Sequence, residues 1–133
     1  IVLSSCSNKK KEYNQNLNTF KNLIVDINNY FIDSTLNNTT ISNYYTDNFV
    51  FYSYPAGYKK GMKSSKAEYL QGFNQMKKQN ISINIGHSIY LPGIDEQSHQ
   101  IDGSVRVYYG ATISIDTNNI EFSGYQTINF EFR

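Results

Sequence analysis

Few residues in this chain are of types that carry out chemistry, and its two histidines are the first to consider. His87 stands between Ile85 and Ile89 in the run NISINIGHSIYL, so alternation places it on the apolar face of a strand. There it would be a core residue bonded to a carbonyl or hydroxyl, or a residue lining a pocket, whereas a bulge at Gly86 would turn it outward. His99 lies in a polar loop, and the spacings H-x-H and H-E-x-x-H do not occur. The sequence therefore predicts neither a metal site nor a cofactor.

Asp47 is the carboxylate best placed to act as an acid or base, because it stands between a predicted short helix and a strand. A carboxylate at such a junction more commonly caps the backbone, and the local sequence favours that structural role. The sequence contains no G-x-S-x-G motif, P-loop or dinucleotide fingerprint. These residue types alone do not define a reaction.

Cys6 is the only cysteine, so an intrachain disulfide is excluded. It follows Leu3-Ser4-Ser5 and precedes three lysines, an order that resembles the lipobox of bacterial lipoproteins. The resemblance implies export, cleavage before Cys6 and diacylation of the new N-terminus. Since Ser7 rather than an aspartate follows, it also implies a cell-envelope location at the outer membrane, facing the periplasm. The alternative is an incidental free cysteine.

Length and composition indicate one domain. The chain has 133 residues, of which 39% are apolar and 15% aromatic, enough for a single core. Its net charge is +1, with 12 Lys and Arg against 11 Asp and Glu, so no nucleic-acid partner is expected. No stretch has the roughly 18 apolar residues of a spanning helix, so a lipid on Cys6 would be the membrane contact. The predicted organisation is a signal-peptide remnant (1–5), a polar tether (6–17) and a folded domain (18–133).

Apolar residues recur at helical spacing in the first half of the chain. They predict one helix over 18–34, a short second helix over 40–45, and a third that begins at Ser65. Ser65 and Glu68 form a capping-box signature at that start. Residues 49–54 are rich in β-formers and predict a strand, which ends at a turn.

Beyond residue 80 the apolar period changes to two, which predicts three antiparallel strands. The predicted inward faces are Ile81, Ile83, Ile85, His87, Ile89 and Leu91 in the first strand, Val105, Val107, Tyr109, Ala111, Ile113 and Ile115 in the second, and Ile120, Phe122, Gly124, Gln126, Ile128, Phe130 and Phe132 in the third. Helices followed by a sheet with one apolar face predict an α+β fold, in which the N-terminal helices pack on one face of the sheet.

The stretch YYTDNFVFYSYPAGYKKGMKSSKAEYL, within that order of elements, resembles the NTF2-like superfamily and its SnoaL-like and ketosteroid-isomerase-like members. The resemblance spans residues 18–133 and implies a cone, in which a curved antiparallel sheet wraps a long helix around an apolar cavity. It implies that the family's final strand is truncated here. It also implies a homodimer through the outer sheet face, on which Arg106, Tyr108, Thr112, Tyr125 and Thr127 would lie.

The isomerase branch of this family also implies positions for a site. Alignment on Tyr45-Thr46-Asp47 puts the general base at Ser53, a hydroxyl donor at Tyr30 and a second oxyanion donor at Gln126. A serine without a partner base cannot abstract a carbon-bound proton near neutral pH, so the isomerase activity is not carried over. The resemblance leaves a pocket lined by four ligand-binding residues, which are Tyr30, Ser53, His87 and Gln126.

Three functions follow from these observations. The first is a lipid-anchored module that binds a small apolar or amphipathic ligand in the cone. The second is a SnoaL-like isomerase, cyclase or lyase with His87 or Asp47 as a non-standard acid or base. The third is a dimeric scaffold or assembly protein. The expected cavity and the missing base favour the first.

Overall fold

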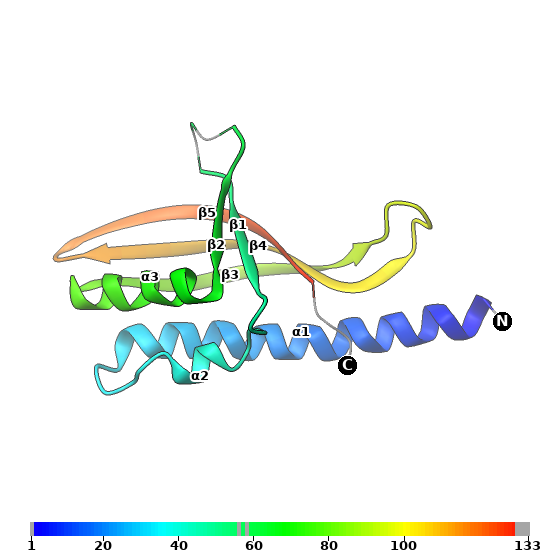
Figure 1. The fold of residues 1–133 in the computed structure, drawn as a ribbon, viewed down its shortest axis with the longest axis horizontal. Coiled ribbons are helices and arrows are strands. Elements are labelled where there is room, and N and C mark those ends of the chain that lie inside the picture. The colour runs from blue at the N-terminus through cyan, green and yellow to red at the C-terminus, as the bar shows by residue number, and fades with distance from the viewer. Residues whose placement is uncertain (1, 56, 58, 130–133) are drawn as a thin grey trace.

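The chain folds into helices packed against antiparallel sheets. The computed structural model describes residues 2–55, 57 and 59–129, with the helix backbone alone for residues 2–7. Its elements are α1 (Val2–Ile32), α2 (Thr39–Ser42), β1 (Val50–Ser53), β2 (Met62–Ser65), α3 (Lys66–Lys78), β3 (Ile81–Ile94), β4 (Ile101–Ile115) and β5 (Asn118–Ile128). The strands form two sheets, a hairpin of β1 with β2 and a sheet in the order β3-β4-β5. The predicted α+β class is confirmed (Figure 1).

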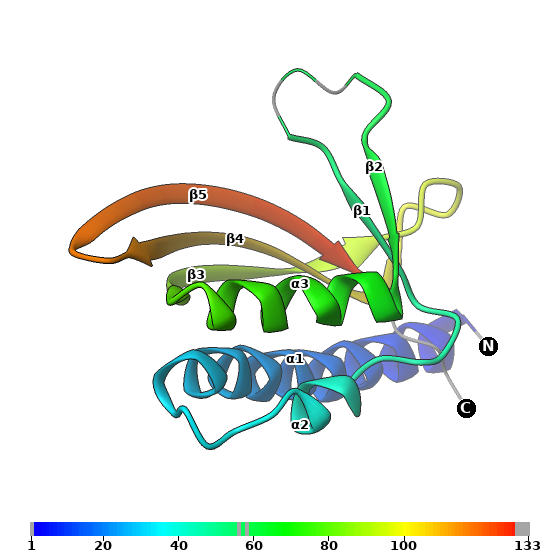
Figure 2. The same ribbon diagram turned by 60° about the vertical axis from the view of Figure 1, so that its left-hand side comes forward.

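The three-stranded sheet is curved, and its concave face is turned toward the helices. In Figures 1 and 2 it arches over α3 and α1, while the β1–β2 hairpin stands away from the arch. Consecutive strands pair through short turns, so the sheet is a simple meander. The helices and the concave face therefore enclose the region in which side chains from distant parts of the sequence meet.

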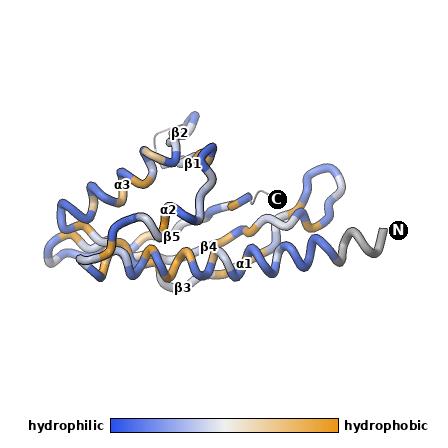
Figure 3. Tube along the Cα trace, turned by 60° about the horizontal axis from the view of Figure 1, so that its bottom comes forward, coloured by the Kyte–Doolittle hydropathy of each residue, from blue (hydrophilic) through white to orange (hydrophobic). Residues whose placement is uncertain are grey.

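The first helix begins well before residue 18, where the sequence predicts its start. Residues 8–17, assigned to a polar tether, continue α1. Figure 3 shows this part of the helix as mainly hydrophilic. Tyr13 and Leu17 nevertheless pack against the core, and the Asn16 side chain donates a 2.8 Å hydrogen bond to the Gly103 carbonyl. The polar composition concealed a sparse apolar stripe that extends the helix toward the N-terminus.

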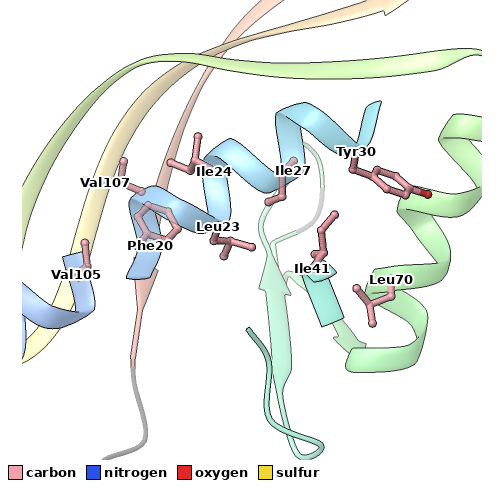
Figure 4. Packing of buried hydrophobic residues seen from close by; sticks show 9 residues of the cluster. All are labelled: Phe20, Leu23, Ile24, Ile27, Tyr30, Ile41, Leu70, Val105 and Val107. Atoms are coloured by element: carbon pink, nitrogen blue, oxygen red, sulfur yellow. The ribbon is translucent and has the colours of Figure 1, made fainter. Parts of the chain in front are cut away.

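The core lies where α1 meets β4, α2 and α3 (Figure 4). Its buried side chains are Phe20, Leu23, Ile24, Ile27, Tyr30, Ile41, Leu70, Val105 and Val107. The five from α1 recur at spacings of three and four, so one helical face supplies most of the cluster. Ile41, at 1% exposure, explains why so short a helix as α2 is held in place.

Strand β3 contains a bulge. The ladder with β4 shifts register between Ile85 and Ser88, so Gly86 and His87 stand opposite the single residue Gly110. A bulge of this kind reverses the alternation of faces in the rest of the strand. The prediction that His87 faces inward is wrong, because its side chain is exposed. The alternative, a bulge at Gly86 that turns His87 outward, is confirmed.

The second half of β3 is inverted as a result. Tyr90 turns to the core and makes an edge-to-face contact with Phe20, with ring centroids 5.9 Å apart. Ile89 and Leu91, predicted to face inward, are exposed on the opposite face. A side-chain period of two makes this reversal unavoidable once one extra residue is inserted.

Strands β4 and β5 keep the predicted alternation. Val105 and Val107 are completely buried. In β5, Phe122 pairs with Ala111 and Gln126 with Val107, so both belong to the concave face. Phe130 and Phe132, which the same alternation assigns to that face, lie outside the described residues.

The segment around β1 and α3 also follows local sequence signals, with one strand added. The β1 strand and the short α2 helix occur where the sequence predicts them. The Ser65 hydroxyl accepts from the Glu68 N–H at 3.3 Å, while Glu68 Oε2 accepts from the Ser65 N–H at 2.7 Å, so the capping box is confirmed. The Ser65 N–H and the Ser65 hydroxyl both donate to this carboxylate, the latter at 2.8 Å, and these two bonds lower the pKa of Glu68. The MKSS segment of β2 was not predicted, because it has no apolar alternation.

The amide of Asn28 fastens α1 to the edge of the sheet. Its Oδ1 accepts a 2.8 Å bond from the Ile85 N–H, and its Nδ2 donates a 2.9 Å bond to the Ile85 carbonyl. Because β3 is an edge strand, these groups would otherwise need a further strand or water. These two hydrogen bonds lie at Ile85, directly before the bulge in β3.

Tyr44 provides a pH-dependent contact between α1 and the segment after α2. Its hydroxyl donates to Asp26 Oδ2 at 2.5 Å, and burial, together with that carboxylate, raises the pKa of Tyr44 to about 12. A raised pKa favours the protonated folded form, so its contribution is complete below pH 10 and is lost as pH rises through 12. We expect Tyr44→Phe to flatten the fall in the free energy of unfolding over this interval, by less than about 1 kcal/mol since solvent screens the pair. Urea titrations at both ends of the interval measure the free energy of unfolding. If it fell as much with pH in Tyr44→Phe as in the unaltered protein, the prediction would be wrong.

Candidate functional site

Tyr30, the first predicted site residue, is held in the core by contacts between helices and does not line a pocket. It is buried, its hydroxyl donates a 2.7 Å bond to Asn74 Oδ1, and Lys77 Nζ lies 4.2 Å from its ring centroid. Burial raises the pKa of Tyr30. The residue therefore joins α1 to α3.

Gln126 lies at a different level of the fold. It pairs with Val107, as does Tyr90 from the other side, and the Tyr90 ring contacts Phe20 of α1. Gln126 is therefore level with Phe20, ten residues before Tyr30, which corresponds to about 15 Å along the helix. Tyr30 and Gln126 share the concave side of the sheet but are not brought together.

The other two predicted residues are also apart from these. Ser53 ends β1 in the separate hairpin, where it pairs with Met62. His87 is exposed at the bulge. The four residues thus do not form one pocket. Asp47, the candidate acid or base, is exposed and lies 3.5 Å from Lys66 Nζ in an ion pair.

The structure brings together three tyrosines that the sequence did not single out as a site. Tyr45 follows α2, Tyr69 lies on α3 and Tyr109 lies on β4. The Tyr45 and Tyr69 rings meet edge to face with centroids 5.4 Å apart, and Tyr109 contributes to the raised pKa of Tyr69. Burial is the main cause of the raised pKa of all three hydroxyls. We call this group the tyrosine cluster.

Aromatic rings surround the tyrosine cluster on the helix side. Tyr69 makes ring contacts with Phe51 at 4.8 Å, Phe73 at 5.0 Å and Phe49 at 5.4 Å between centroids. On the sheet side the Tyr109 ring covers Gly124, where an added Cβ would lie 2.5 Å from Tyr109 Cζ. The glycine therefore makes room for the tyrosine between β4 and β5.

Beyond Tyr109, the concave face of β5 is open. Ile120 is 54% exposed and Phe122 37% exposed, although both point to the side on which the helices pack. The Phe122 ring stands 6.4 Å from that of Tyr109. Apolar surface and phenolic hydroxyls are thus adjacent, an arrangement that suits a small amphipathic molecule.

Sequence reasoning missed the tyrosine cluster because its members come from three different elements. Alternation correctly predicts that Tyr109 lies on the inner face. Tyr45 belongs to the tripeptide that resembles the family, and nothing in its local sequence marks it as a site residue. Tyr69 sits one residue from Leu70 on α3 and is four residues before Phe73, a spacing that marks a shared helical face. That spacing was the available signal, although it carries no information about β4.

The convex face carries the residues assigned to a dimer interface. Tyr108 and Tyr125 are each 51% exposed there, with ring centroids 4.7 Å apart. Arg106, Thr112 and Thr127 share that face by register. The homodimer stays a prediction.

Comparisons of the chain with protein-family models, curated protein sequences and solved structures found no match. Within the described part of the chain, no group of three His, Cys, Asp or Glu side chains could hold a metal ion. None of the helices that the structure describes has the length and apolarity needed to cross a bilayer.

Proposed function

We propose that the chain is an NTF2-like, SnoaL-like cone that acts as a binding module for a small apolar or amphipathic molecule. The binding surface is the concave face of β5 next to the tyrosine cluster. The observation that carries the proposal is the exposed apolar pair Ile120 and Phe122, with the Phe122 ring 6.4 Å from that of Tyr109.

The hydroxyls supply the polar part of this recognition. The Tyr69 phenol can donate one hydrogen bond to a ligand. Among the described residues, Tyr109 has no hydrogen-bond partner for its hydroxyl, which makes it a second donor. A ligand carbonyl near these groups would gain about 0.5–1.5 kcal/mol per bond.

The apolar part comes from covering the exposed surface of β5. Removing apolar surface from water contributes about 25 cal/mol per Å². A ligand ring placed against Phe122 and Ile120 would remove surface from both partners. The arrangement favours binding over catalysis, because burial raises the pKa of these phenols and so keeps them protonated near neutral pH, where they cannot serve as a general base.

Binding of 1-anilinonaphthalene-8-sulfonate to the folded chain tests the assignment of the concave face. Phe122→Glu should weaken dye binding at least about tenfold, since it places a charge where apolar contact is expected. Tyr125→Glu is the matched control, because it introduces the same charge on the convex face of the same strand. Equal effects of the two variants on the dissociation constant would refute the assignment.

We further propose that the module is anchored in the cell envelope through a diacylated Cys6, outside the cytoplasm. Two acyl chains give stable anchoring, whereas one is marginal. Cys6→Ser in the expressed precursor should therefore move most of the protein from the membrane to the soluble fraction. Fractionation with immunoblotting measures the change, and Ser7→Ala serves as the neighbouring control. Membrane retention of Cys6→Ser equal to that of the unaltered protein would exclude the anchor.

A further inference from the structure

The sheet contains a polar hollow at the β3 bulge, which opens on the convex side, across the sheet from the tyrosine cluster. Its volume is about 460 Å³, within the range of small-molecule sites. It is lined by Gly86, His87, Gly110, Ala111, Thr112, Glu121, Phe122 and Ser123. The concave-face proposal uses the Phe122 side chain, whereas the polar side chains of this hollow have no role in it.

Glycine creates the floor of the hollow. A Cβ added to Gly110 would meet no atom within 4 Å, so the space above this residue is open. Gly110 stands opposite the bulge on one side and opposite Ser123 on the other. Because Gly86 and Gly110 have no side chains, the sheet has a depression here between the neighbouring rows of side chains.

Two rows of side chains bound this floor along the strands. On one side Tyr108 pairs with Tyr125, and on the other Thr112 pairs with Glu121. Each row is two residues from Gly110, about 7 Å along the strand. The tyrosine rings are in contact, and Thr127 Oγ1 donates to the Tyr125 hydroxyl at 2.9 Å, which holds that ring in place.

The polar side chains of the hollow are all available. In the part of the chain that the structure describes, no hydrogen bond or ion pair engages the side chain of His87, Thr112, Glu121 or Ser123. Together they offer a carboxylate acceptor, two hydroxyls and an imidazole that both donates and accepts. One small area thus presents donors and acceptors in similar number.

We propose that the hollow binds a neutral saccharide unit. Sugar hydroxyls donate and accept equally, which matches this set of side chains, and the apolar C–H face of a pyranose suits the exposed pair Tyr108 and Tyr125. A phosphate is disfavoured, because the lining contains Glu121 and no Lys or Arg. An apolar ligand is disfavoured by the polar lining, so this site differs in chemistry from the concave face of β5.

Protein NMR tests this with D-glucose, D-galactose, D-mannose and N-acetyl-D-glucosamine, each titrated into the ¹⁵N-labelled full chain. We expect at least one sugar to shift the amide signals of Gly86, Gly110 and Ser123, with a dissociation constant on the order of 1–10 mM. Gly110→Leu should abolish these shifts, because its side chain starts in open space above the floor and would occupy the hollow. Gly72→Leu on α3 is the control, since a side chain there also enters open space.

Glu121→Gln tests whether the Glu121 carboxylate takes part in sugar binding or only borders an open depression. Loss of the charged acceptor should weaken sugar binding about tenfold while the fold is kept. Absence of shifts with all four sugars, or shifts that persist in Gly110→Leu, would overturn the proposal. Shifts with tetramethylammonium but with none of the sugars would overturn it too, because a cation would then be the ligand. Dye binding on the concave face should not change in Gly110→Leu, so the two binding proposals fail independently.

Discussion

Lys77→Met is expected to lower the free energy of unfolding by about 2–4 kcal/mol. Lys77 Nζ donates to the carbonyls of Tyr30 at 2.6 Å, Asp33 at 2.7 Å and Leu36 at 2.8 Å. It thereby closes the C-terminal end of α1 and the following loop, where the backbone carbonyls lack helical partners. A cation at this end of a helix is also favoured by the helix dipole.

Lys78→Met is the matched control for this prediction. Lys78 is the adjacent residue, is exposed, and makes no hydrogen bond or ion pair in the described structure. We expect its replacement to change stability by no more than about 0.5 kcal/mol. Urea denaturation of both variants compares them at equal loss of charge. If the two variants were equally stable, the three carbonyl bonds would have no net effect, and the account of α1 termination would be wrong.

Asn28→Ala is expected to destabilise the protein by about 1–3 kcal/mol, since it leaves the N–H and carbonyl of Ile85 without protein partners. Hydrogen exchange of the Ile85 amide should accelerate in the same variant, because the bond that protects it is removed. Asn28→Asp should be at least as damaging, since a carboxylate cannot donate to the carbonyl.

Asn29→Ala provides the reference for that variant. Asn29 is exposed on the same helix, and its side chain makes no hydrogen bond within the part of the chain that the structure describes. Its replacement should be nearly neutral or slightly favourable, because alanine has the higher helix propensity. Equal stability of Asn28→Ala and Asn29→Ala, with unchanged exchange at Ile85, would show that the amide does not fasten β3.

Much of the fold was predictable from periodicity. The spacing of Phe20, Ile24 and Ile27 identified the buried face of α1, and strict alternation identified the inner face of β4. Ser65 and Glu68 marked the start of α3. In each case the signal is local, because one helix or strand buries one face and the residue types record which face that is.

The features that the sequence did not predict depend on contacts between segments far apart in the chain. Alternation through His87 could not decide between a regular strand and a bulge, because both satisfy the isoleucines at Ile83 and Ile85. The bulge is a feature of the pairing of β3 with β4, and Asn28 bonds to Ile85 directly before it from 57 residues away. The tyrosine cluster was missed for the same reason, since three elements far apart in the sequence supply its hydroxyls.

The long-range fastening of α1 has a consequence for synthesis on the ribosome. Asn28 bonds to Ile85, which is 57 residues later in the chain, and Asn16 bonds to Gly103, 87 residues later. The apolar stripe of α1 therefore leaves the ribosome well before the strands that cover it. At a synthesis rate of about 5–20 residues per second, it stays uncovered for several seconds. During that interval an amphipathic helix with an uncovered face is a substrate for holding chaperones, and the nascent chain gains its first stable core only when β4 has emerged.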